Sequence, residues 1–226
     1  YKLKESKIIV KYLDKETNEE IADSKIINAN VYDEVTEKAI EVEKYNLAEG
    51  EELYKSIASL SKDGAANIII FYYTKKPVEL VTPDFEKTAS VEGNKVDSLN
   101  DKITYSLNAK SEIKNFEGDV TITLVDNLPF AINLEKSNLN CTSENNCTYE
   151  YDKENKTITF TITIKDINTY NEPNKVYNLD YTHTIEIVYD IDAKDLTGEE
   201  TELVNNLSGT VTVGKESKSN ISDPEP

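Results

Sequence analysis

The sequence of 226 residues contains no methionine, tryptophan, arginine or glutamine, and it has only one histidine, two cysteines and seven glycines. Because all 25 cationic side chains are therefore lysines, the chain has no guanidinium group for two-pronged contacts with phosphates. The 43 acidic residues give a net charge of −18, so the protein would repel a phosphate backbone. This composition argues against a nucleic-acid-binding protein.

Long apolar segments are also missing. The longest run, Ile68–Tyr73, is far shorter than the roughly 20 residues that a transmembrane helix needs. The chain begins at Tyr1, without a basic and apolar leader. We therefore expect these residues to be a segment of a longer protein, with no membrane span of their own.

The two cysteines, Cys141 and Cys147, lie in the short segment Cys-Thr-Ser-Glu-Asn-Asn-Cys. This spacing differs from the C-x2-C pairs of zinc sites, and with one histidine a four-ligand site is hard to assemble, so we expect no metal. Two alternatives stay open, a small-loop disulfide formed in an oxidising compartment or two free thiols in a mobile loop. We expect the lone histidine, His183, to be a surface residue in a strand-edge segment.

A change in composition near Pro77 divides the chain. Two lysines and this proline follow an apolar run, which is typical of a strand that leads into a linker. We expect a first module at residues 1–76, a linker at 77–81, a second module at 82–214 and a polar linker tail at 215–226.

Apolar and polar residues alternate with the period of two that indicates β-strands. In the first module this pattern covers residues 8–13, a polar turn at 14–20 and a return strand at 21–27. In the second module the alternating segments are 103–107, 120–124, 157–164, 184–191 and 203–213. Because no convincing amphipathic helix accompanies them, we expect a mainly β protein whose second module is an antiparallel, immunoglobulin-like β-sandwich.

Three segments of the first module are distinctive: Ile8–Asp14 (IIVKYLD), Glu20–Ala22 (EIA) and Ile70–Thr74 (IFYYT). They resemble the opening strand, the return and the closing strand of a MucBP (mucin-binding-protein) repeat, although the family's central Gly-Tyr is Lys44-Tyr45 here. The resemblance implies a small, β-grasp-like module and a host mucin or another extracellular glycan or protein as ligand. The tyrosines that could stack on sugar rings are Tyr45, Tyr54, Tyr72 and Tyr73; the alternative is that they are half-buried core residues of a spacer.

Three short motifs mark the second module: Phe85–Ala89 (FEKTA), Val125–Pro129 (VDNLP) and Leu203–Leu207 (LVNNL). They resemble the immunoglobulin-like stalk domains of Gram-positive adhesins and pilins of the collagen-adhesin type. In that family a lysine and an asparagine condense into an intramolecular isopeptide bond with the help of an acid. The resemblance implies a cross-link between Lys87 and Asn205, assisted by Asp126, that would join the first and last strands.

Strand alternation gives an independent reason to single out these residues. Lys87, Asp126 and Asn205 each share parity with apolar neighbours and should point into the core, whereas Asn206, the other candidate partner, should face outward. Burial favours the neutral amine and the neutral acid, so the amine could attack the carboxamide and release ammonia. The alternative is that Lys87 reaches the surface and Asn205 caps backbone groups at a bulge.

We expect a non-enzymatic pair of modules from a bacterial surface adhesin, monomeric, free of cofactors and anchored to the cell wall through other regions. It would serve in attachment to host mucin, glycan or matrix and as a mechanically robust stalk. The alternative is an accessory, non-catalytic region of a secreted glycan-degrading enzyme. The acidic pairs Glu51–Glu52 and Glu199–Glu200 do not make a glycosidase, because adjacent strand residues face opposite ways. Calcium-stiffened linkers, based on acidic loops such as Asp190–Asp192, are a third hypothesis.

Overall fold

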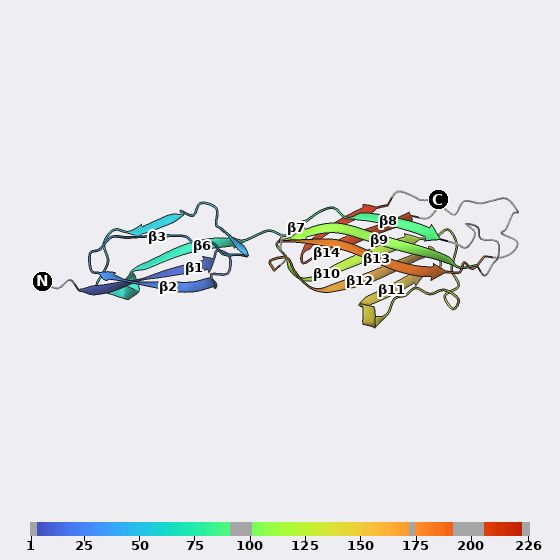
Figure 1. Cartoon of the computed structure of the whole chain (residues 1–226), viewed down its shortest axis with the longest axis horizontal. Helices are drawn as coiled ribbons and strands as arrows, with labels where there is room; N and C mark the ends of the chain where they lie inside the picture. Colours follow the sequence, from blue (N-terminus) through green and yellow to red (C-terminus); the bar gives the residue numbers. More distant parts are fainter. Residues whose placement is uncertain (1–3, 91–100, 172–174, 192–205, 223–226) are drawn as a thin grey trace. The chain divides into compact units, whose positions relative to one another are not determined.

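The computed structural model describes residues 4–90, 101–171, 175–191 and 206–222, and the chain divides into two compact units, Tyr1–Pro77 and Val78–Pro226 (Figure 1). The division falls within the linker expected at 77–81. Helical structure in the described ranges consists of the 3₁₀ turns η1 (Gly64–Ala66) and η3 (Ser143–Asn145), and no helix there could span a membrane. The predicted mainly β fold is confirmed.

The first unit is built from two sheets. The main sheet has the strand order β2-β1-β6-β4, and β3 pairs with β5 in a second, two-stranded sheet. β1 and β2 form an antiparallel hairpin, whereas β1 and β6 run parallel, which brings both ends of the module together in one sheet. The bounds are β1 (Glu5–Asp14), β2 (Glu20–Asn30), β3 (Val35–Lys38), β4 (Tyr45–Leu47), β5 (Tyr54–Ile57) and β6 (Ile68–Lys75).

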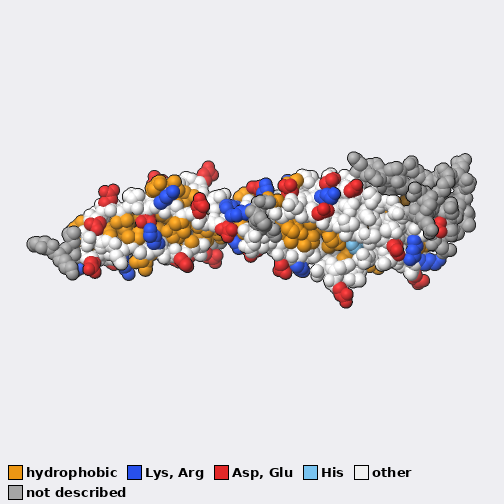
Figure 2. All heavy atoms as spheres, viewed as in Figure 1, with side chains coloured by type: hydrophobic (Ala, Val, Ile, Leu, Met, Phe, Trp, Pro, Cys, Tyr) orange, Lys and Arg blue, Asp and Glu red, His pale blue; other side chains and the backbone are white. Residues whose placement is uncertain are grey.

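Alternation along β1 and β6 decides which side chains of the first unit are buried. One face of the main sheet packs into the core and contributes Ile8, Val10, Tyr12, Ile69, Phe71 and Tyr73, all nearly inaccessible. The opposite face carries half-buried apolar residues such as Ile9 and Ile70. Hydrophobic side chains accordingly form a band, interrupted by charges, on the surface of this unit (Figure 2).

The second unit is a sandwich of two antiparallel sheets that share one hydrophobic core. One sheet has the order β11-β12-β10-β14-β15, and the other has the order β13-β9-β7, with β8 also paired to β9. Their bounds are β7 (Glu79–Leu80), β8 (Asp84–Ser90), β9 (Ile103–Lys114), β10 (Glu117–Asn127), β11 (Cys147–Asp152), β12 (Thr157–Asn168), β13 (Val176–Ile187), β14 (Asn206–Val213) and β15 (Glu216–Ile221).

The segment expected to be a polar linker tail is a strand over most of its described length. β15 pairs with β14 through a two-residue turn at Gly214 and Lys215, and Gly214 has a φ of +61°, as the first central residue of a type II′ turn requires. Every residue of β15 is exposed, so backbone hydrogen bonds rather than burial define the strand. The strand expected at 203–213 is therefore not the last one, because β15 follows β14.

Gly209 allows the two sheets of the second unit to approach each other. It lies in β14 opposite Leu124, and a Cβ atom at this position would lie 2.5 Å from Cζ of Phe85 in β8. Phe85 is itself only 3% exposed and cannot swing into solvent. Because Gly209 has no side chain, the ring of Phe85 in one sheet can pack directly against the backbone of β14 in the other sheet.

We predict that Gly209→Ala destabilises the second unit by about 1–3 kcal/mol, the usual cost of an overpacked core. Phe85→Leu should relieve this clash, so the double variant should be more stable than the sum of the two single effects. Chemical denaturation of the four proteins in this cycle measures the coupling. Simple additivity of the two changes would show that the contact does not set the sheet spacing.

Candidate functional site

A lysine and an aspartate meet in the core of the second unit. Lys87 in β8 and Asp126 in β10 come from opposite sheets, and Nζ lies 2.6 Å from Oδ1. The Lys87 side chain is 5% exposed and that of Asp126 is fully buried, so the predicted inward direction of both is confirmed. The alternative in which Lys87 reaches the surface is wrong.

The surroundings of Lys87 favour a less basic amine. Burial lowers the pKa of Lys87, and the carboxylate of Asp126 opposes this shift without cancelling it. Nζ lies 3.9 Å from the ring centroid of Tyr105, a contact that, like the carboxylate, favours the charged amine and opposes the effect of burial. With the pKa of Lys87 lowered, the neutral, nucleophilic form of the amine is more accessible here than at a surface lysine.

The third predicted residue, Asn205, lies outside the described residues. Its neighbour Asn206 begins β14, is exposed and stands opposite Asn127. Leu207 is fully buried and stands opposite Asp126. The described start of β14 thus has the predicted alternation. Asn206 faces outward, and the next residue, Leu207, is the one that pairs with Asp126.

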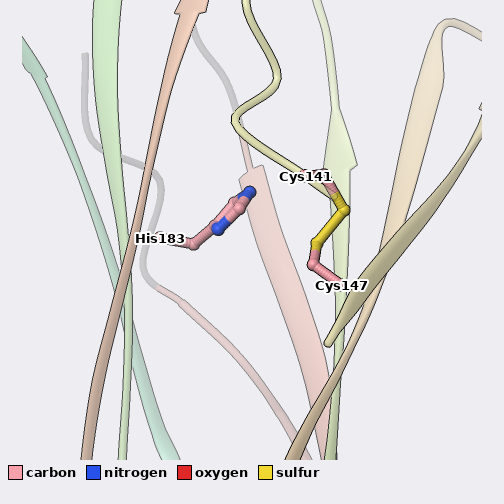
Figure 3. Close-up of side chains that lie close together, drawn as sticks. All are labelled: Cys141, Cys147 and His183. Atoms are coloured by element: carbon pink, nitrogen blue, oxygen red, sulfur yellow. A yellow bond between two sulfur atoms is a disulfide. The ribbon is translucent and has the colours of Figure 1, made fainter. Parts of the chain in front are cut away.

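Cys141 and Cys147 are joined in a disulfide, with Cys147 as the first residue of β11. His183 of β13 lies beside this disulfide (Figure 3). His183 is only 2% exposed, so the expectation that it is a surface residue is wrong. Its Nε2 is 2.9 Å from the carbonyl oxygen of Leu139, and its ring centroid is 4.8 Å from that of Phe160 in β12. This cluster of a disulfide and a histidine spans the two sheets.

Strand alternation in the sequence indicates that His183 faces inward. It shares strand parity with Ile185 and Ile187, which are both buried. The Leu139 carbonyl that receives it lies 44 residues away, and no local pattern indicates such a partner.

The four tyrosines proposed to contact glycans do not share one surface. Tyr73 is 1% exposed and donates a hydrogen bond to the Ile40 carbonyl at 2.8 Å, so its assignment as a glycan contact is wrong. Tyr45 packs against the same core, Tyr54 belongs to the separate β3–β5 sheet, and Tyr72 alternates with Tyr73 onto the other face of the main sheet. The residues therefore do not assemble into a single stacking platform.

Among the described residues, the group that could hold a metal ion, Cys141, Cys147 and His183, contains no carboxylate. Asp190 makes an exposed ion pair with Lys153 at 3.2 Å, while Asp192 and the pair Glu199–Glu200 lie outside the described residues. Glu51 pairs with Lys55.

No protein-family model and no curated protein matches the chain. Among solved structures, it is similar to the full-length major pilin SpaD from Corynebacterium diphtheriae, with 12% sequence identity and a TM-score of 0.40. The match covers 99% of this chain and 65% of that pilin, so the chain spans less than two thirds of its length.

We predict a pH dependence from His183. Burial lowers its pKa, although the contact with the Leu139 carbonyl opposes this shift. Below the ordinary pKa of about 6.5, the unfolded state binds a proton that the folded state resists. The free energy of unfolding should therefore fall with decreasing pH below 6.5, by up to about 1.4 kcal/mol per pH unit.

Denaturation of the protein and of His183→Gln between about pH 7 and pH 5 measures this effect, because both share every other titrating group. The difference between the two stability curves should change only below the unfolded-state pKa. Parallel curves would contradict a buried, neutral histidine.

Proposed function

We propose that this chain is a non-enzymatic pair of modules from a bacterial surface stalk, and that Lys87 and Asn205 of the second unit become joined by an amide bond. The observation that carries the proposal is the buried ion pair between Lys87 and Asp126. It supports a reactive role for both residues, in line with the family resemblance of the motifs around them.

An ion pair in this position needs an explanation beyond stability. Removing two charges from water costs several kcal/mol for each, and well-packed apolar residues often replace such a pair at no loss of stability. The core around the pair is otherwise apolar: Phe85 and Leu124 lie two residues from Lys87 and Asp126 in sequence, and Leu107 stands opposite Lys87 in β9. A chemical role accounts for its presence.

The proposed reaction is an amide exchange. The neutral amine of Lys87 attacks the Cγ carbon of Asn205 and forms a new C–N bond, and Asp126 transfers the proton from the attacking nitrogen to the leaving one. The original C–N bond of the carboxamide breaks, and ammonia departs. No oxidant or cofactor is needed, and each molecule reacts once.

Chain connectivity supports Asn205 as the partner. It is bonded to Asn206, whose register partner Asn127 is the residue after Asp126. A reactant held in place by a folded sheet gains the large effective concentration of an intramolecular group. Asn206 itself is exposed and therefore a poor partner for a buried amine.

The first unit serves as a spacer in this proposal. The tyrosines expected to bind mucin or glycan are divided between the core and separate faces, so nothing favours a ligand site that contains all four. The disulfide supports an extracellular, cell-surface location, because such bonds persist in oxidising compartments.

We predict that the intact protein, denatured and reduced, weighs one ammonia less than its sequence requires. Lys87→Met, Asp126→Ala and Asn205→Ala should each restore the full calculated mass, because each removes one member of the reaction. Intact-mass spectrometry measures all four proteins.

Asn206→Ala is the matched control and should keep the deficit, since this neighbour faces solvent. An unmodified mass for the starting protein would overturn the cross-link. Full mass in Asn206→Ala with a deficit in Asn205→Ala would instead move the bond to the neighbour.

We predict a mechanical signature for the bond. Force applied through the ends of the chain should not lengthen residues 87–205, whereas β14 and β15 lie after the bond and stay extensible. Lys87→Met should add extension over the whole enclosed segment, at about 3.3–3.6 Å for each unravelled residue. Single-molecule stretching compares the unsubstituted protein with Lys87→Met, and equal extensions would contradict a bond that carries the applied force.

A further inference from the structure

We propose that the second unit, in its reduced state, holds a site for a thiophilic divalent cation such as Zn²⁺, formed by Cys141, Cys147 and His183. The two Sγ atoms and a ring nitrogen of His183 all lie within 4.8 Å of one another. Figure 3 shows the imidazole and the two sulfur atoms side by side. This site is separate from the proposed cross-link and does not depend on it.

The three residues come from separate elements that the fold brings together. Cys147 is the first residue of β11, at the edge of the five-stranded sheet. Cys141 lies in the preceding loop, and the 3₁₀ turn η3 between them brings Cys141 back toward Cys147. His183 projects from β13 of the opposite sheet. The cysteine spacing and the single histidine were the reasons to expect no metal, and the fold brings that histidine from a distant strand to the two cysteines.

The imidazole is held in place without a metal. Phe160 packs against it, Nδ1 lies 3.3 Å from the hydroxyl of Tyr181, and Nε2 lies 2.9 Å from the Leu139 carbonyl. A metal-binding histidine usually has one ring nitrogen fixed by an oxygen of this kind. Burial also lowers the pKa of His183, which favours the neutral ring that binds metals.

Reduction converts the sulfur atoms into ligands. In the disulfide they share a covalent bond and carry no thiolate. An external dithiol supplies two electrons and two protons, so the S–S bond breaks to give two thiols while the dithiol becomes a disulfide. Zn²⁺ then displaces both protons, and two thiolates balance its charge beside one neutral imidazole.

The distances suit such an ion. Tetrahedral zinc with Zn–S of about 2.3 Å and Zn–N of about 2.0 Å places its ligand atoms about 3.3–3.8 Å apart. The present separations of up to 4.8 Å require nitrogen and sulfur to approach by up to about 1.3 Å, and the sulfurs to move apart once their bond is broken. Cys141 is only half-buried, so solvent can reach the site and supply the fourth ligand.

Titration of the full chain with Co²⁺ tests the proposal. After reduction with a phosphine and removal of oxygen, one Co²⁺ per chain should bind and show thiolate-to-cobalt charge transfer with the visible bands of tetrahedral cobalt. Zn²⁺ should displace it. The oxidised protein and a reduced Cys141→Ser/Cys147→Ser variant are the matched controls and should lack these bands.

His183→Gln should weaken Co²⁺ binding at least tenfold, and circular dichroism of its oxidised form shows whether it folds. Should it fail to fold, alkylation of the unsubstituted, reduced protein still decides the matter, because bound Zn²⁺ should slow modification of both thiols. Co²⁺ binding no tighter than in the double-serine variant would overturn the site, as would thiols that react equally fast with and without Zn²⁺. Unchanged affinity in a folded His183→Gln would remove histidine from it.

Discussion

The structure of the second unit depends on a lysine and an aspartate that face each other between two sheets. Neither side chain is stable there alone, because loss of one partner leaves an uncompensated buried charge that costs about 3–5 kcal/mol. Lys87 is fixed through the pairing of β8 with β9, and Asp126 through the pairing of β10 with β12 and β14. The ion pair therefore requires both sheets to keep their registers, and it penalises sliding of one sheet over the other.

Period-two alternation predicted the strands with one buried face, and it found Lys87 and Asp126 because they break the apolar pattern. The same rule places His183 inside, because it shares strand parity with the buried Ile185. Alternation fails where both faces are apolar: the run at 68–73 does not reveal that Tyr73, rather than Tyr72, faces the core. β15 escaped prediction because its residues are all exposed, and backbone pairing leaves no trace in the side-chain pattern.

The two covalent links differ in what they constrain. The disulfide closes a loop of six residues in sequence separation, which in the chain-entropy model contributes only about 2 kcal/mol. Its position is more informative than its stabilising effect, since it holds the segment around Leu139 and Cys141 against His183. A bond from Lys87 to Asn205 would instead enclose most of the strands of the sandwich.

Both sites use polar groups at the interface between the same two sheets. Apolar contacts across a sandwich are non-directional and tolerate small displacements, whereas a buried polar group demands a partner at a defined distance. Lys87 finds that partner in β10, and His183 finds one in the Leu139 carbonyl while it packs on Phe160 of β12. The Lys87–Asp126 contact joins the two sheets directly, whereas the segment of Leu139 pairs with β13 itself at Asn138 and Glu186, so His183 reaches the other sheet through its ring contact with Phe160. An amide bond can form only if the reacting atoms are held within contact distance, and the pairing with Asp126 is what would hold the Lys87 amine in place for it.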